Sequence, residues 1–338
     1  MSETIIVEFS GDCWYRPTLF QEQLNQVPPG VSVILDMRSE GPSLQALGVT
    51  DVINSWLRDR QQSPESVQLL RWSNPVEFVP YRLILCNNLS HFFGMSKNYW
   101  TESVQHTHNN LFGLFVGRMT HARAVILYQC IVEKQDIFVS KMSSQTPYPW
   151  HLDTQDEINL ENLSDWLSTS QQYRMFEWYN RCDISSVDQM TVRDQFTNPE
   201  SYADTNRSLL NHYNQFAIEI VCETYTLGNT FFPTEKTIRP IMAAKPILVY
   251  GPQYFLARLR TLGFQTYNTL WDESYDFYQG AQRWQLMKQV IQSINKKTLD
   301  QQQQLIAKAN EIALYNRQRL HNIINHRVIL HNHAYKNI

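Results

Sequence analysis

The 338-residue chain has only five cysteines, which are scattered and include no Cys-x-x-Cys pair. This pattern is untypical of a disulfide framework or a zinc site, and it indicates a reducing compartment. The net charge of −3 leaves no basic field that would recruit nucleic acid or a membrane surface. No apolar run approaches membrane-spanning length, and the first residues lack the pattern of a signal peptide. We therefore expect a cytoplasmic protein with no nucleic-acid partner and no integral membrane segment.

Two glycine-rich phosphate-binding signatures are also missing. The chain contains neither the Gly-x-Gly-x-x-Gly of dinucleotide-binding folds nor the Gly-x-x-x-x-Gly-Lys of P-loop proteins. Each signature lets backbone N–H groups approach phosphates closely, so its absence argues against that class of nucleotide-binding enzyme. Another kind of nucleotide-binding α/β enzyme stays open at this point.

Short apolar segments alternate with amphipathic ones in the first part of the chain. Strands are predicted at residues 5–9, 31–35, 67–71 and 82–86, and an amphipathic helix is predicted at residues 44–58. Strands that are apolar at nearly every position are typical of a sheet covered on both faces, and β-then-α alternation favours parallel strands. The sequence therefore predicts an α/β fold.

A second β-then-α unit follows a stretch that has no clear period. Residues 91–110 are polar and aromatic, and we interpret them as a loop and linker. A strand at residues 111–116, followed by a helix and another strand, begins the alternation again. We therefore expect two domains, residues 1–108 and 109–338, with a helical end over residues 284–330.

The most informative stretch is Phe-Phe-Pro-Thr-Glu-Lys-Thr-Ile-Arg-Pro at residues 231–240. An acid and a base, Glu235 and Lys236, stand where a loop is predicted to become a short helix. A helix N-terminus gathers unpaired N–H groups and the positive end of the dipole, so it attracts phosphate. Lys236 adds a full positive charge, and Glu235 is suited to accept hydrogen bonds from ribose or sugar hydroxyls. The pair alone is more typical of a solvated first helical turn, where an acid is normal, and the flanking motifs favour the functional interpretation.

Several motifs follow one another in a recognisable order around this pair. They are Val-Cys-Glu-Thr, Thr-Glu-Lys, Lys-Pro-Ile and Tyr-Gly-Pro, at residues 221–224, 234–236, 245–247 and 250–252. This order resembles the donor-binding motif of bacterial α1,3-fucosyltransferases. Uncharacterised glycosyltransferases of phages and large viruses are similar over a wider stretch, which here adds Leu-Gly-Phe-x-Thr and Trp-Asp-Glu-Ser-Tyr-Asp and extends to residue 276. Their strand that ends in an Arg/His-rich turn matches residues 115–123.

The resemblance implies a GT-B glycosyltransferase, with two Rossmann-like domains that face each other across a cleft. In that architecture the C-terminal domain binds the nucleotide sugar, and terminal helices pack back on the N-terminal domain. The implied reaction transfers a sugar from a GDP- or UDP-linked donor to a glycan or other hydroxyl acceptor, with inversion. Positive side chains and helix dipoles replace a metal in such enzymes, and the Asp-x-Asp signature is absent here, so we expect no metal and no further cofactor.

The resemblance also assigns donor contacts to particular residues. Arg118 and Arg123, from the first βα turn of the second domain, are candidates to clamp the diphosphate, and ordinary surface helix positions are the alternative. Glu223 follows an apolar strand at the edge where α/β sheets place ligands, with a local salt bridge as its alternative. Phe232 stands where the fucosyltransferases have an aromatic hydroxyl. The expected donor-binding residues are Arg118, Arg123, Glu223, Phe232, Thr234, Glu235 and Lys236.

Three acids in the Trp-Asp-Glu-Ser-Tyr-Asp motif resemble a metal-binding group. Asp272, Glu273 and Asp276 are close enough in sequence to suggest one. Since a GT-B enzyme would use positive side chains instead, we expect these acids to cap the following helix or to hold a hydroxyl.

Inverting transfer needs a carboxylate that takes the proton from the acceptor hydroxyl. It should come from the N-terminal domain, across the cleft from the donor. Asp12 and Asp36 both follow predicted strands and are the candidates, although acids in such places often only end turns. A retaining mechanism stays open, and so does a glycosyltransferase-like binding protein that has lost catalysis.

Overall fold

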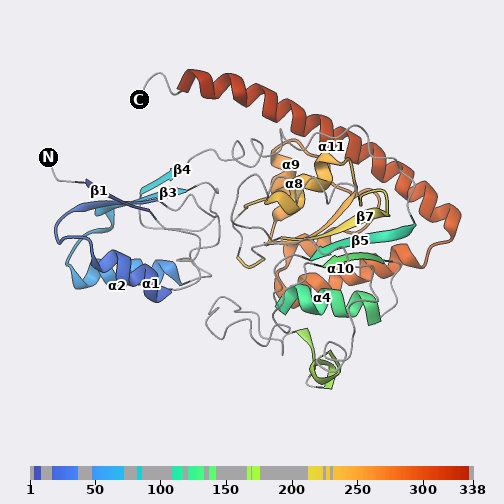
Figure 1. The fold of residues 1–338 in the computed structure, drawn as a ribbon, viewed down its shortest axis with the longest axis horizontal. Coiled ribbons are helices and arrows are strands. Elements are labelled where there is room, and N and C mark those ends of the chain that lie inside the picture. The colour runs from blue at the N-terminus through green and yellow to red at the C-terminus, as the bar shows by residue number, and fades with distance from the viewer. Residues whose placement is uncertain are drawn as a thin grey trace.

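The structure is a computed structural model, and it shows a mixed α/β protein with two parallel sheets. It describes residues 4–8, 17–36, 48–71, 82–85, 109–116, 121–132, 137–141, 166–168, 170–175, 212–223, 226–228 and 231–334. Each sheet has four strands and its own buried hydrophobic cluster. Figure 1 shows the two sheets in separate lobes, the first in blue and the second in green to orange. The predicted α/β class is confirmed.

The first sheet contains the N-terminal strands in sequence order. They are β1 (Thr4–Glu8), β2 (Ser32–Asp36), β3 (Val67–Arg71) and β4 (Arg82–Leu85), and every neighbouring pair is parallel. The helices α1 (Pro17–Asn25) and α2 (Val49–Asp59) lie on the same side of this sheet (Figure 1). The side chains of Val33 and Leu35 are buried, while Ile34 between them is half-buried, as the two-residue period of a strand requires. Trp56 Nε1 joins the two helices by donating to the Leu24 carbonyl at 2.9 Å.

The second sheet has a different strand order. Its strands are β5 (Asn110–Val116), β6 (Ile137–Lys141), β7 (Phe216–Cys222) and β8 (Ile247–Tyr250), arranged β6-β5-β7-β8 with all pairs parallel. The chain runs outward from β5 to β6 and then returns to place β7 on the other side of β5. The order therefore reverses between β5 and β7. In open α/β sheets, ligands bind at the carboxyl ends of the two strands that flank such a reversal.

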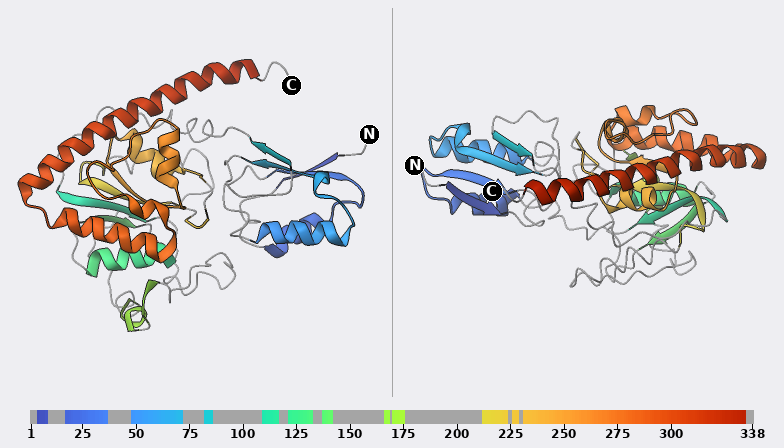
Figure 2. Two further views of the ribbon diagram at one scale, coloured as in Figure 1. Left: turned by 180° about the vertical axis from the view of Figure 1, so that it is seen from behind. Right: turned by 90° about the horizontal axis from the view of Figure 1, so that it is seen from above.

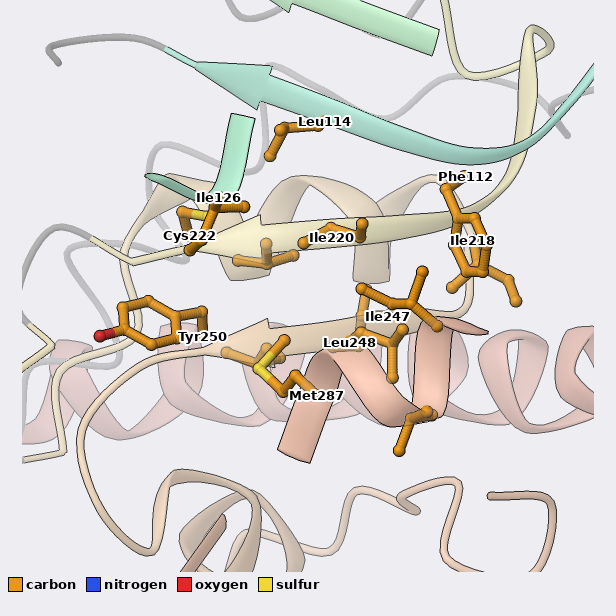
Figure 3. Close-up of a cluster of buried hydrophobic side chains, with 14 of the residues drawn as sticks. Phe112, Leu114, Ile126, Ile218, Ile220, Cys222, Ile247, Leu248, Tyr250 and Met287 are labelled. Carbon is orange, nitrogen blue, oxygen red and sulfur yellow. The ribbon is translucent and has the colours of Figure 1, made fainter. Parts of the chain in front are cut away.

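Helices cover both faces of the second sheet. Helices α4 (His121–Val132) and α10 (Gly280–Asn295) lie on one face, and α8 (Glu235–Met242) lies on the other, together with part of α11 (Leu299–Ala334) (Figures 1 and 2). Every residue of β7 is buried, which explains why nearly all of its side chains are apolar. Figure 3 shows Ile218, Ile220 and Cys222 along β7, with Ile126 of α4 near Cys222 and Met287 of α10 near Leu248 of β8, all in one hydrophobic cluster.

The long helix α11 packs on the second core. Leu305, Ala309 and Leu320 are buried and form an apolar face of the helix. Buried Asn316 forms two hydrogen bonds with the backbone of Gln265, both at 2.8 Å. These contacts of α11 are thus with residues of the second sheet, its helices and their loops. The expectation that the terminal helices pack back on the N-terminal domain stays a prediction. Within the part of the chain that the structure describes, no helix is both long enough and apolar enough to cross a membrane.

A buried arginine joins the end of β8 to the start of α10. Arg283 has no exposed surface. Its guanidinium donates to the carbonyls of Val249 and Pro252, at 2.9 and 3.0 Å, and forms an ion pair with Asp276 at 3.1 Å. The loop after β8 therefore depends on one buried charge pair.

The acids of residues 271–276 bind the protein itself. The Asp276 carboxylate accepts the backbone N–H groups of Leu256 and Ala257, at 2.9 and 3.0 Å, and so caps α9 (Phe255–Thr261). Glu273 and Asp272 likewise accept backbone N–H groups, at 2.7 and 2.8 Å. The prediction that these acids cap the following helix is wrong for Asp276, because the helix whose N–H groups it accepts precedes the motif. The chain folds back so that α9 lies beside residues 271–276. The separation of the two segments in the sequence does not indicate this contact.

We predict that Asp276→Ala lowers the free energy of unfolding by about 3–5 kcal/mol, because Arg283 would be left as an unpaired charge in the core. Urea unfolding followed by circular dichroism measures the change. Asp272→Ala is the matched control, since Asp272 is exposed and its removal deletes only two local hydrogen bonds, from the N–H and the hydroxyl of Ser274. That variant should lose about 1 kcal/mol. Equal losses in the two variants would contradict the importance of the buried pair.

Candidate functional site

The carboxyl end of β7 and the start of α8 meet through Glu223. This side chain directly follows β7 and is 1% exposed. One oxygen, Oε1, accepts the Thr234 N–H at 3.1 Å and the Thr237 hydroxyl at 2.5 Å, while Oε2 accepts the Thr234 hydroxyl at 2.5 Å. Burial raises the pKa of Glu223, although the nearby Lys236 charge and the two threonine hydroxyls oppose the rise. Glu223 thus fixes the first turn of α8, and its predicted contact with a donor stays a prediction.

Thr234 is the N-cap of α8. Its backbone is extended, and its Oγ1 accepts the Lys236 N–H at 3.3 Å while donating to Glu223. A threonine is suited to this place because its hydroxyl satisfies an N–H group that the helix leaves unpaired. The residue is 4% exposed. The threonine of the Thr-Glu-Lys motif therefore sets where the helix begins, and the helix starts where the sequence predicts that the loop becomes a helix.

Arg123 ties α4 to the same strand end. It stands in the first turn of α4 and is 4% exposed. Its Nη2 donates to the carbonyls of Cys222 and Glu223, at 3.2 and 3.0 Å. These bonds span the reversal in strand order, because α4 follows β5 and Cys222 ends β7. The structure places Arg123 beside the Thr-Glu-Lys motif, and its predicted contact with a diphosphate stays a prediction.

Glu235 and Lys236 are the members of this group that reach solvent. Their side chains form an ion pair at 2.5 Å and are 21% and 18% exposed, respectively. Burial alone would raise the pKa of Glu235, but the charge of Lys236 outweighs it and lowers this pKa to about 2. The first turn of α8 therefore presents a carboxylate and an amine side by side at the carboxyl edge of the sheet.

A second buried carboxylate holds the middle of α8. Glu219 lies in β7 on the same face as Glu223, four residues earlier, and is 1% exposed. Its oxygens accept the Tyr213 hydroxyl at 2.5 Å and pair with Arg239 of α8 at 3.6 Å. Arg239 also donates to the Tyr213 oxygen at 2.9 Å and lies over the ring of Phe115. Burial raises the pKa of Glu219 to about 7, although Arg239 and Tyr213 act against the rise.

Sequence reasoning missed this second anchor. The signal that could have found it is the single acid in the apolar strand Phe-Ala-Ile-Glu-Ile-Val-Cys at Phe216–Cys222. A carboxylate at such a position needs a buried donor, and only a long-range contact supplies one. Its role is to position α8, since its oxygens face buried groups of the protein.

The remaining predicted residues are distributed as follows. Phe232 is buried, at 7% exposed, and its predicted contact with a donor stays a prediction. Asp36 is buried in the first sheet, where it ends β2 between Glu8 and Leu70. Asp12 and Arg118 lie outside the described residues. The structure therefore brings Arg123, Glu223, Thr234, Glu235 and Lys236 together, and it places Asp36 at the carboxyl edge of the other sheet.

No protein-family model, no curated protein and no solved structure matches this chain. Among the residues that the structure describes, no group of three or more His, Cys, Asp or Glu side chains is arranged to hold a metal ion. What the protein does is therefore proposed from the residues at the carboxyl edge.

We predict that Glu219 makes the protein less stable as the pH rises from 4.5 to about 7. The folded state keeps Glu219 protonated to a higher pH than the unfolded chain does, because the ordinary pKa of a glutamate is 4.5 and the folded state raises it to about 7. The folded state thus binds more protons across this interval, so its stability falls with rising pH there and levels off above pH 7. Glu219→Gln should remove up to about 1.4 kcal/mol per pH unit from that slope.

The measurement is urea unfolding at a series of pH values, with the slope as the readout. Above about pH 7 the variant also loses absolute stability, because Arg239 then lacks the ionised partner that it has in the wild type. Glu311→Gln changes an exposed carboxylate on α11 and should keep the wild-type slope. A Glu219→Gln slope identical to wild type would show that the buried carboxyl does not titrate in this range.

Proposed function

We propose that the protein is a GT-B glycosyltransferase that transfers a sugar from a nucleotide-sugar donor to a hydroxyl acceptor. The observation that carries the proposal is the start of α8, which stands at the carboxyl edge beside the strand-order reversal. There Glu223 and Thr234 lock the first turn, and Lys236 reaches solvent from it. A fixed helix N-terminus with an adjacent lysine is suited to a diphosphate.

In this proposal the diphosphate lies against the first turn of α8. Negative charge grows on the diphosphate as the bond to the sugar breaks, and the helix N-terminus and Lys236 stabilise that charge. Arg123 holds the end of β7 in place and adds positive charge beneath the site. Glu235 is ionised and accepts hydrogen bonds from hydroxyl groups of the donor. Positive charge supplied by the protein lets the reaction proceed without a divalent metal.

The two parallel sheets are, in this proposal, the two Rossmann-like halves of the GT-B architecture. Residues 1–108 form the acceptor side and residues 109–338 the donor side. Inverting transfer then needs a base from the first half, at the carboxyl edge of its sheet. Asp36 ends β2 at that edge, which supports its candidacy. The base takes the proton of the acceptor hydroxyl while the hydroxyl oxygen attacks the anomeric carbon and the nucleoside diphosphate leaves.

We predict that Lys236→Ala weakens nucleoside diphosphate binding roughly 30-fold, which corresponds to about 2 kcal/mol. The reason is the loss of a partly buried charge beside the helix N-terminus. Calorimetry with GDP and UDP, in buffer that contains EDTA, measures the affinity and tests metal independence in the same experiment. Lys236→Arg should retain most of the affinity because it keeps the charge.

Lys296→Ala is the matched control for this substitution. Lys296 is the exposed C-cap of α10, a helix whose opposite end lies at the carboxyl edge. Its removal should leave the affinity unchanged. Equal affinities for wild type and Lys236→Ala would refute the donor site. Binding that appears only after manganese or magnesium is added would refute the metal-independent mechanism.

We predict that Asp36→Asn slows sugar transfer about 10²–10⁴-fold and leaves donor affinity unchanged, because a general base acts on the acceptor and not on the donor. Transfer and calorimetry are measured together, with Asp12→Asn in parallel. Asp59→Asn is the control, since Asp59 is exposed at the far end of α2. Normal turnover in both test variants would move the assignment to Glu40 or Glu77. If every acid of residues 1–108 proves dispensable, the retaining mechanism or the non-catalytic binding protein becomes the better proposal.

A further inference from the structure

Three exposed aromatic side chains gather at the carboxyl end of β8. Tyr254 follows that strand by four residues and is 38% exposed, while Phe277 and Tyr278 are 57% and 38% exposed. The rings of Tyr254 and Phe277 meet edge to face, with centroids 6.0 Å apart. These three residues are called the aromatic patch below. Since β8 is the parallel neighbour of β7, the patch lies at the same edge of the sheet as the start of α8.

The backbone of Tyr254 is strained in a way that keeps its ring outside the core. Its φ is 63°, in the left-handed region that a bulky residue rarely enters. Its N–H donates to the Asp276 carbonyl at 2.7 Å, and the Asp276 carboxylate caps the next turn. The surrounding bonds thus hold a conformation that costs free energy by itself. Strain of this kind concentrates at functional sites, where the surroundings maintain it.

The patch is physically continuous with the segment that leads into the Thr-Glu-Lys motif. Phe231, three residues before Thr234, packs its ring on Phe255 at 5.1 Å, and Phe255 is the residue next to Tyr254. Two hydrogen bonds of Gly228 add to the link: its N–H donates to the Gln279 side chain at 2.9 Å, and its carbonyl accepts the Gln253 N–H at 3.0 Å. The loop between β7 and α8 therefore rests against the segments that carry the patch.

We propose that the aromatic patch is the surface on which the nucleobase of the donor stacks. This inference rests on the proposed function and assigns the base-binding residues of that site. A nucleobase presents a flat face to aromatic rings, and such stacking tolerates any base. The patch and the diphosphate site follow neighbouring parallel strands at one sheet edge, which is the arrangement that the base and the phosphates of one nucleotide need. An acceptor sugar, in contrast, enters from the first sheet in the proposed architecture, which makes it the less suitable occupant.

The test compares a nucleotide with a ligand that has no base. GDP, UDP and dTDP are titrated into the full-length protein by calorimetry, and inorganic pyrophosphate is titrated in parallel. Phe277→Ala should weaken the tightest of the three nucleotides roughly 5- to 150-fold and leave the pyrophosphate affinity unchanged. Phe277→Trp should restore the nucleotide affinity, because it returns a ring. Circular dichroism confirms that the variants fold.

Tyr173→Ala is the control for loss of an exposed aromatic ring, because Tyr173 is 67% exposed outside the patch. It should bind every ligand as wild type does. Unchanged nucleotide affinity in Phe277→Ala would overturn this inference and leave the proposed function standing. Equal weakening of nucleotide and pyrophosphate, or a loss confined to acceptor use, would also overturn it. Wild-type protein that binds none of the nucleotides would overturn both proposals.

Discussion

Two buried carboxylates on one face of β7 determine where the candidate site lies. A buried ionisable group is tolerated only when hydrogen bonds or opposite charge compensate it. Glu223 obtains this compensation from the first turn of α8, and Glu219 obtains it from Arg239 and Tyr213. Because each carboxylate has partners in or at the start of α8, the helix is held at its start and in its middle. The position of every side chain in its first turn follows from this double attachment.

The attachment separates residues that build the site from residues that can meet a ligand. The side chains of Thr234 and Glu223 form hydrogen bonds that fix the start of the helix. Glu235 and Lys236 of the first turn, in contrast, reach solvent. The same division occurs beside β8, where Asp276 is buried as a cap and Tyr254 is turned outward. Buried polar networks that are fully satisfied rigidify their surroundings, which is what a preorganised site requires.

Much of the local structure was predictable from neighbouring residues. Strands predicted from apolar segments at residues 5–9, 31–35, 67–71, 82–86 and 111–116 are present in the structure, and a helix begins at Glu235, where the loop was predicted to become one. Which residues of the motif face solvent was not predictable. Glu223 and Glu235 are both acids beside the same helix, yet the first is buried and the second is partly exposed. Their difference arises from which element covers each one.

The sequence by itself thus determined the α/β alternation, the strand segments named above and the start of α8, because these depend on a few adjacent residues. Only the tertiary structure decided the strand order, the reversal beside β7 and the partners of the buried charges. Arg123 meets the backbone of Glu223 across 100 positions of sequence, and Arg283 meets Val249 across 34. Such contacts form when separate elements pack together, and the direction of a buried side chain depends on that packing, which no local pattern specifies.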